Sequence, residues 1–325
     1  MTGPAIDPQE AAAPHRVVAL GGGHGLAASL SALRRIVDDL TAVVTVADNG
    51  GSSGRLRGEL GVLPPGDLRQ ALAALCGDDE WGSTWARVLQ HRFASAGELH
   101  NHALGNLLIV ALWELLGEHV AGLDWVARLL GAKGRVLPMT AVPLDIVAHV
   151  TGLHPHDPDR LETVRGQVEA ATTRGRVVDV SLEPSDPLAC AEAVAAVKAA
   201  SHVVLGPGSW FTSVIPHLLV PGLGDALCDT DAVRVVTLNL AAQPGETDGL
   251  SPSNHLDVLS AHAPRLRVDV VLADRRTVHD VVSLRQSAAA LGAELIVADV
   301  AMGDGTARHD PELLADAYAR ILART

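Results

Sequence analysis

The sequence predicts an α/β protein built on a doubly wound, mostly parallel sheet, with a helical insertion and a small antiparallel β addition. Short apolar runs such as RVVAL, HVVLG and VDVVLAD alternate with helical segments, a rhythm typical of parallel sheets covered by helices. Residues from about 64 to 132 interrupt that rhythm with helical periodicity, and residues from about 133 to 185 are extended and rich in β-branched side chains. We therefore expect a single α/β domain over 16–325, preceded by a flexible tail at 1–15.

The first half of the domain begins as a βαβ unit. RVVAL at 16–20 and TAVVTVA at 41–47 are predicted strands, and the helix between them is expected from about 26 to 37. The insertion follows, with helices in DLRQALAALC, STWARVLQHRF, ALGNLLIVALWELL and LDWVARLL. Its apolar stretch LLIVALW is too short to span a bilayer, so we expect a buried helix there.

The antiparallel addition is predicted from RVLPMTAVPLDIVAHVTG, RLETVRGQVEAA and GRVVDVSLEP. From 187 the alternation resumes, with strands in HVVLG, RVVTLNL, VDVVLAD and ELIVADV. Helices are expected in AEAVAAVKAA, after GPGS, around HLDVLSAH and LRQSAAALG, and from 311 to the C-terminus.

Composition argues against several classes of function. There are 25 Lys and Arg against 38 Asp and Glu, a net charge of −13, and only 2% of residues are aromatic, so a nucleic-acid partner is not expected. Three cysteines without paired spacing favour a reducing compartment over disulfides or a zinc site. The N-terminal residues lack the order of a signal peptide, and we expect a cytoplasmic protein without membrane insertion.

Ligands of open parallel sheets bind outside the carboxyl ends of the strands, where the winding reverses. The loops predicted at those ends are GGGHG at 21–25, ADNGGSS at 47–53, GPGS at 206–209 and NLAAQPGETDG at 239–249. If the usual strand order holds, the strands before Gly21 and Gly206 are neighbours, and two glycine turns face each other. Each turn opens a helix whose free N–H groups favour an anion, so a phosphate or diphosphate is the expected ligand.

Each of these signals also has a structural explanation. Gly23-x-Gly25-x-x-Ala28 fits a dinucleotide pattern, with Asp48 as the ribose-binding acid, but such turns also serve tight helix–strand packing. Asp48 could be a turn residue, and Asp67, after a Pro-Gly turn, could be a helix cap. Of the two arginines behind the Gly-Ser loop, we favour Arg55 as a ligand residue and leave Arg57 open, with a solvated basic pair as the alternative.

Three further polar loops each allow a functional and a structural interpretation. His100 and His102 in HNHALGN resemble a metal-binding pair but lack a further ligand nearby, so we favour hydrogen bonding at a helix start and make no metal assignment there. GETDG offers Glu246, Thr247 and Asp248 beside Asn239 for reading a sugar or a base, or forms an ordinary polar loop. In RHDPE the Asp-Pro pair is expected to start a helix, which leaves Arg308 available.

The strings GGGHGL, TVADNGGSSGRLR, PPGDLR, HALGNLL, GPGSWFTSVIPHLLVPG, GETDGLSPSNHL and RHDPELL together resemble the YvcK family of gluconeogenesis factors. The resemblance runs from about residue 16 to the C-terminus. It implies a Rossmann-like fold related to CofD, the 2-phospho-L-lactate transferase of deazaflavin-cofactor synthesis. The YvcK branch is associated with binding UDP-N-acetylglucosamine and with cell shape, cell-wall synthesis and gluconeogenic growth, without an established reaction.

The resemblance and the loop argument together give the expected ligand-binding residues. They are Gly22, Gly23, His24, Gly25, Asp48, Asn49, Gly50, Ser52, Ser53, Arg55, Asp67, Asn106, Gly206, Gly208, Ser209, Asn239, Thr247, Asp248 and Arg308. The family usually reads GGGTG and DDGG, whereas this chain has His24 and Asn49 at the differing positions. Losing the second acid weakens the case for magnesium, for which Asp48 is the remaining candidate ligand.

Three functions compete at this stage. The leading hypothesis is a nucleotide-sugar-binding regulator of cell-envelope and central carbon metabolism, with a nucleoside diphosphate or UDP-sugar as ligand. The first alternative is a CofD-like transferase that moves a phospho-organic acid from a nucleoside diphosphate to an acceptor hydroxyl, which requires a metal-holding acid besides Asp48. The second is an NAD(P)-dependent dehydrogenase. A homo-oligomer and protein partners in cell-wall regulation remain open.

Overall fold

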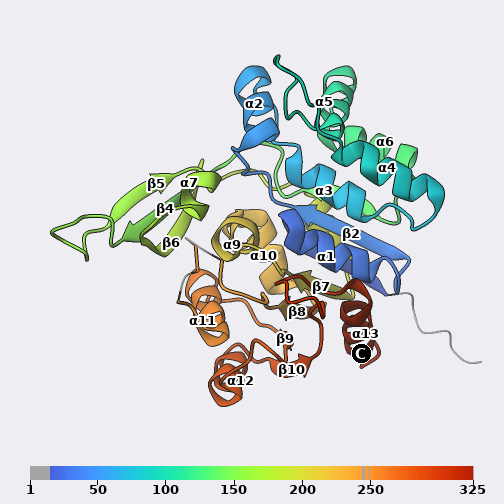
Figure 1. Ribbon diagram of the computed structural model, residues 1–325. Coiled ribbons are helices and arrows are strands. Elements are labelled where there is room, and N and C mark those ends of the chain that lie inside the picture. Colours follow the sequence, from blue (N-terminus) through green and yellow to red (C-terminus); the bar gives the residue numbers. More distant parts are fainter. Residues whose placement is uncertain (1–14, 244–245, 248, 325) are drawn as a thin grey trace, which may run out of the picture.

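The computed structural model describes residues 15–243, 246–247 and 249–324 (Figure 1). A seven-stranded sheet with the order β10-β9-β8-β7-β1-β2-β3 forms its centre, and every pairing in it is parallel. Its strands are β1 (Arg16–Gly21), β2 (Asp39–Val44), β3 (Arg135–Pro138), β7 (His202–Leu205), β8 (Val233–Thr237), β9 (Val270–Asp274) and β10 (Glu294–Ala298). The doubly wound parallel sheet expected from the sequence is confirmed.

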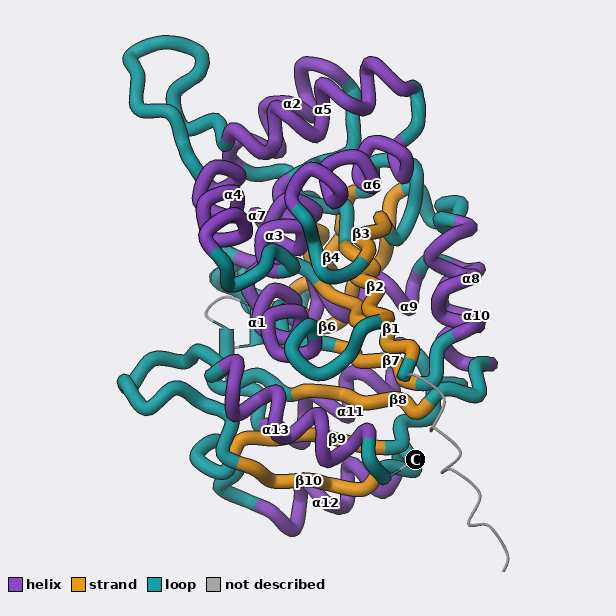
Figure 2. Tube along the Cα trace, turned by 90° about the vertical axis from the view of Figure 1, so that its right-hand side faces the viewer, coloured by secondary structure: helices purple, strands orange, loops and turns teal. Residues whose placement is uncertain are grey.

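Helices cover both faces of this sheet, which explains why its central strands are continuously apolar. In Figure 2, α1 and α3 lie to the left of the strands, and α8 and α10 lie to the right. The first face carries α1 (Gly23–Leu33), α3 (Gly66–Ala74) and α13 (Pro311–Leu322). The opposite face carries α8 (Ala191–Ala199), the π-helix η1 (Trp210–Val214), α9 (Ile215–Leu219), α10 (Pro221–Asp229), α11 (Pro252–His262) and α12 (Val281–Ala290).

The winding of the sheet reverses at β1. This strand pairs with β2 on one side and with β7 on the other, where Leu20 lies opposite Leu205. Both strands are followed by glycine turns, so the predicted neighbourhood of Gly21 and Gly206 is confirmed. The carboxyl ends of β1 and β7 therefore define the position where a ligand of this fold class is expected.

The helical insertion lies above one end of the sheet in Figure 1. Besides α3 it contains α4 (Glu80–Gln90), α5 (Leu104–Leu116) and α6 (His119–Leu130), and α2 (Gly51–Leu60) precedes it in the chain. The α5 helix buries Ile109, Val110 and Trp113, as expected for its apolar stretch. The α2 helix was not expected, because its sequence GGSSGR is rich in residues of low helix propensity.

The small antiparallel sheet projects to the left in Figure 1 and has the order β5-β4-β6. Its elements are β4 (Asp145–Thr151), β5 (Glu162–Arg165), β6 (Arg176–Glu183) and the short helix α7 (Gln167–Ala171). Two assignments in 133–185 differ from expectation. β3 pairs in parallel with β2 and so belongs to the main sheet, and QVEAA is helical.

Within the described part of the chain, no single helix is both long and apolar enough to cross a membrane. One pair, Trp210–Leu219 with Pro221–Asp229, reaches the required length and composition together but is bent by 84°.

Candidate functional site

The two glycine turns touch at the carboxyl end of the β1–β7 pair. A Cβ atom on Gly25 would lie 2.2 Å from the carbonyl oxygen of Pro207 and 2.5 Å from Cα of Gly208. Real Cβ atoms do not approach backbone this closely, so only glycine allows the start of α1 to pack against the GPGS turn. The turns therefore form one structure, with no room for a ligand at the contact itself.

The second glycine turn has most of its N–H groups occupied by side chains of the same protein. The N–H of Gly208 donates to Oδ1 of Asn239 at 2.8 Å, and Nδ2 of Asn239 donates back to the Gly208 carbonyl at 2.7 Å. Glu246 accepts from the N–H groups of Phe211 and Thr212 at 2.8 and 2.9 Å, and also from the Ser209 hydroxyl. In this conformation, therefore, the N–H groups of the two turns cannot all bind the same diphosphate.

Glu246 and Thr247 are both buried. The sequence indicated that GETDG is either a loop that contacts a sugar or a base or an ordinary polar loop. Burial raises the pKa of the Glu246 carboxyl, and its bonds to Ser209 and to the backbone oppose that rise. The Thr247 hydroxyl accepts from the Gln243 N–H at 2.8 Å. Asp248 lies outside the described residues.

The first glycine turn keeps free donors. The N–H of Gly23 bonds the Asp67 carboxylate, but among the described residues none accepts from the N–H groups of His24 or Gly25. These two residues open α1, where the helix dipole adds positive potential. The anion-binding capacity of the crevice is thus concentrated at His24 and Gly25.

His24 and Gly25 line a cavity of about 560 Å³, which we name the glycine-turn cavity. Its other walls come from Pro207 and Gly208, from the segment 239–243 after β8, and from 307–311 at the start of α13. Arg308 lines it with a side chain that is 68% exposed and 3.4 Å from Asp304. The cavity therefore combines helix-start N–H groups with an exposed cation, a pairing suited to phosphate.

A chain of buried hydroxyls fixes the floor beneath this cavity. Tyr318 of α13 bonds Thr237 at the end of β8 at 2.9 Å and Ser29 of α1 at 2.8 Å, and Ser29 donates to the Gly206 carbonyl. Burial raises the pKa of Tyr318 to about 12, so it stays a neutral phenol. No sequence motif marks Tyr318, because its partners are brought together only by the fold.

Asp48 and Asp67 form an acid pair on the other side of the first glycine turn. Asp67 lies in the first turn of α3, and Oδ2 of Asp48 comes within 2.9 Å of where a Cβ of Gly66 would stand. Burial, and then the charge of Asp48, raise the pKa of Asp67 to about 7. Asp67 does not cap its own helix, as capping alone would predict, but bonds the Gly23 N–H at the start of α1.

Other expected ligand residues around α2 hold the insertion together. Ser52 bonds His102, the Ala103 N–H and Nδ2 of Asn106 at 3.0, 3.3 and 3.0 Å, which fixes α2 to the start of α5. Arg55 donates to backbone carbonyls in the loop before α5. Ser53 is buried against Gly66, and the N–H of Gly50 bonds Asp48.

Asn49 connects the main body to the small sheet. Its Nδ2 donates to Oε2 of Glu169 at 2.8 Å, and its Oδ1 accepts from the Val168 N–H at 3.0 Å. Both partners belong to α7, so this amide is already engaged within the protein. Among the described residues there is no group of three or more His, Cys, Asp or Glu side chains placed to hold a metal ion.

A second cavity, of about 360 Å³, adjoins the glycine-turn cavity. We name it the His255 cavity. It lies between the segment after β8, the start of α11 and the loop from β9 to α12, and shares Asn239, Leu240, Ala241 and Ala242 with the first cavity. Of its lining residues, only Asn239 was expected from the sequence to contact a ligand.

Comparison with known proteins gives the family. A family model described as 2-phospho-L-lactate transferase CofD matches residues 17–308. The chain belongs to the CofD family. Within that family, a protein of Mycobacterium tuberculosis (strain H37Rv) named "Putative gluconeogenesis factor" is 55% identical over 311 residues, which cover 95% of this chain and 90% of the relative.

Other relatives agree with this placement. The "Gluconeogenesis factor" of Listeria monocytogenes is 36% identical over 318 residues and covers 94% of this chain and 95% of its own length. A crystal structure of a UPF0052-family protein from Bacillus halodurans superposes with a TM-score of 0.84 at 32% identity, covering 94% of this chain and 99% of that one. The resemblance to the gluconeogenesis-factor branch of the CofD family is confirmed.

Proposed function

We propose that this CofD-family protein binds a nucleoside-diphosphate-linked sugar of the UDP-N-acetylglucosamine kind and acts as a regulator of cell-envelope and central carbon metabolism. The diphosphate lies in the glycine-turn cavity. The observation that supports this placement is that His24 and Gly25, whose N–H groups have no acceptor among the described residues, line the same cavity as Arg308. The volume of the glycine-turn cavity is within the range of small-molecule sites.

The position of the cavity supports the same proposal. It lies at the point where the sheet reverses its winding, between β1 and β7, which is where folds of this class bind nucleotides. The second glycine turn contributes backbone shape there, while Asn239 and Glu246 occupy its N–H groups. One helix start and one arginine therefore provide the phosphate contacts.

The test is calorimetric titration with UDP-N-acetylglucosamine, GDP, NAD and NADP, each with and without magnesium. Arg308→Ala should lower affinity for the bound diphosphate about tenfold, since it removes a charged contact. Arg275→Ala is the matched control. Its side chain is 66% exposed and 3.3 Å from an aspartate, Asp299, but it does not line the cavity, so affinity should stay within twofold. Absence of binding by every diphosphate at millimolar concentration would contradict the proposal.

A CofD-like transferase is the second candidate, and one observation favours it. That reaction needs an acid besides Asp48, and the fold places Asp67 beside it. Two carboxylates with phosphate oxygens suit magnesium, and Asp48 and Asp67 are the residues that would hold it. The metal would neutralise charge on the phosphates during attack by the acceptor hydroxyl.

Binding and transfer can be separated by following the nucleotide. In the transferase reaction a new P–O bond forms to the acceptor oxygen, the P–O bond to the nucleoside monophosphate breaks, and the acceptor proton is lost to a base. Release of nucleoside monophosphate that requires an acceptor and is abolished in Asp67→Asn would support the transferase. Quantitative recovery of intact nucleotide sugar after prolonged incubation would favour the regulator.

A further inference from the structure

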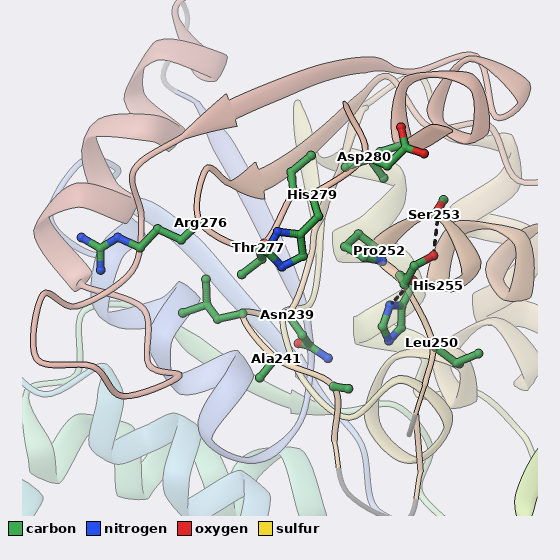
Figure 3. A pocket seen from close by; sticks show the side chains of 15 residues that line it. Asn239, Ala241, Leu250, Pro252, Ser253, His255, Arg276, Thr277, His279 and Asp280 are labelled. Atoms are coloured by element: carbon green, nitrogen blue, oxygen red, sulfur yellow. Dashed lines mark hydrogen bonds between the residues drawn. The ribbon is translucent and has the colours of Figure 1, made fainter. Parts of the chain in front are cut away.

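The glycine-turn cavity is enclosed by four segments that lie far apart in the sequence. They are the start of α1, the GPGS turn after β7, residues 239–243 after β8, and residues 307–311 at the start of α13. Figure 3 shows Asn239 and Ala241 of the third segment, on the side where it borders the His255 cavity. A diphosphate held between helix-start N–H groups and Arg308 requires these four walls to keep fixed distances from one another.

One series of hydrogen bonds joins all four walls from behind, and we name it the hydroxyl relay. Tyr318 of α13 lies at its centre, 2.9 Å from the Thr237 hydroxyl at the end of β8 and 2.8 Å from the Ser29 hydroxyl of α1. Ser29 donates to the carbonyl of Gly206, the first residue of the GPGS turn, at 2.9 Å. Gly25, one turn before Ser29 on α1, packs against the next residues of the same turn. None of the four relay residues lines the cavity itself.

The number of hydrogens available fixes the direction of every bond in the relay. The Gly206 carbonyl can only accept, so the single hydroxyl hydrogen of Ser29 points to it. The hydrogen between Ser29 and Tyr318 must then come from Tyr318, and the hydrogen between Tyr318 and Thr237 must come from Thr237. Burial raises the pKa of Tyr318 to about 12, so its phenol keeps the hydrogen that this arrangement requires.

The position of α13 relative to α1 depends on Tyr318 more than its position relative to β8 does. The bond from Tyr318 to Ser29 is, among the described residues, the only hydrogen bond between α13 and α1. The connection to β8 has a second bond, because the His309 ring also bonds the Leu238 backbone. Without the Tyr318 hydroxyl, α13 would stay attached to β8 but could shift against α1, and Arg308 would shift with it.

Resting on the proposed function, we propose that Tyr318 is a positioning residue of the diphosphate site. Its hydroxyl fixes α13, and the Arg308 segment that leads into α13, against α1 and the GPGS turn. Tyr318 is the single tyrosine of the chain, and phenylalanine would fill the same buried space. The hydroxyl rather than the ring is therefore what the site requires, and it acts on affinity through Arg308.

Calorimetric titration with UDP-N-acetylglucosamine tests this in four full-length proteins: wild type, Tyr318→Phe, Arg308→Ala and the double variant. Tyr318→Phe should bind about fivefold more weakly than wild type, less than the about tenfold loss expected for Arg308→Ala, because Arg308 is still present. In the Arg308→Ala background, Tyr318→Phe should weaken binding by less than about twofold, since both changes act through one contact. Equal losses in the two backgrounds would indicate general loosening of the protein and overturn the proposal.

The stability of the variants must be separated from their affinity. Tyr318→Phe leaves the buried Thr237 hydroxyl without its acceptor, which lowers stability. Adding Thr237→Val removes that hydroxyl, so the combined variant Tyr318→Phe/Thr237→Val should recover most of the lost Tm while its affinity stays low. If affinity recovered together with Tm, the role of Tyr318 would be structural only and the proposal would be wrong.

Thr230→Val is the matched control. Thr230 is also buried, and its hydroxyl joins the end of α10 to the Val197 carbonyl of α8 at 3.1 Å. It precedes β8 and so lies at the amino end of the sheet, away from the glycine-turn cavity. Its replacement should lower Tm but leave affinity within about twofold of wild type.

Amide hydrogen exchange without ligand tests the positioning role independently of nucleotide binding. In the combined variant, residues 300–311 and the GPGS turn should exchange faster than in wild type, whereas the small antiparallel sheet should be unchanged. Unchanged exchange in the first two segments would overturn the role of Tyr318 even if nucleotides bind. Failure of every nucleotide to bind the wild-type protein would reject the proposed function, and the exchange data would still decide whether Tyr318 holds these segments in place.

Discussion

The contact between the two glycine turns can be tested by adding a single methyl group to Gly25. In Gly25→Ala the new Cβ would start 2.2 Å from the Pro207 oxygen, 1.2 Å short of the 3.4 Å at which ordinary contact begins. Its neighbours are backbone atoms of Pro207 and Gly208, which cannot rotate away as a side chain could. The start of α1 and the GPGS turn must therefore separate by roughly 1 Å.

The expected cost follows from two opposing terms. Overpacking of this kind costs about 1–3 kcal/mol, whereas replacing glycine by alanine in a helix gains up to about 1 kcal/mol. The net loss should be about 1–2 kcal/mol, which corresponds to a decrease in Tm of a few degrees in a chain of this length. Because His24 and Gly25 also line the glycine-turn cavity, nucleotide affinity should decrease about tenfold.

Thermal melts, urea unfolding and calorimetric titration measure these effects. Gly58→Ala is the control, because Gly58 lies inside α2 with no neighbouring atom within 4 Å of its added Cβ. It should stabilise the protein by up to about 1 kcal/mol and leave binding unchanged. A Gly25→Ala protein as stable as wild type, with equal affinity, would show that the turns are not in contact and would refute the site geometry.

Two further predictions concern the acid pair and the junction with the small sheet. Folding raises the pKa of Asp67 from its usual value to about 7, so the native state favours its protonated form, and the free energy of unfolding should fall as pH rises from about 4 to 7. Urea unfolding at several pH values should show this dependence in the wild type and not in Asp67→Asn. The same pH profile in both proteins would contradict the prediction. Asn49→Asp restores the usual family acid but sets a carboxylate against Glu169, whose pKa the Asn49 amide now lowers. That variant should be less stable than wild type at neutral pH, with the loss recovered in the double variant carrying Glu169→Gln; a neutral effect in melting experiments would show that the junction is not needed.

Much of the fold could be predicted because the signals were local. The alternation of apolar strands with helices predicted the main sheet. The general rule for doubly wound sheets predicted that the strands before Gly21 and Gly206 are neighbours, and they are. The α2 helix was missed because glycine and serine have low intrinsic helix propensity, and β3 was misassigned because a four-residue strand looks the same at the edge of either sheet.

The site was harder to predict because its contacts join distant segments. Glu246 reaches N–H groups 34 and 35 positions earlier, and Asp67 reaches the start of a different helix. Asn49 was expected in the ligand site, yet its partners lie about 120 residues away on α7. Sequence motifs identified the residues that matter but not which of them face each other.

The central position of β1 has a consequence for how the protein is made. Val17 pairs with His202, which is synthesised 185 residues after it. Until β7 has been synthesised, one edge of a strand that is buried almost throughout has no partner. That edge is therefore open to non-native pairing for as long as the intervening segment takes to be synthesised. The contact between the two glycine turns can form only after that point, and a chain released before His202 would expose an edge prone to aggregation.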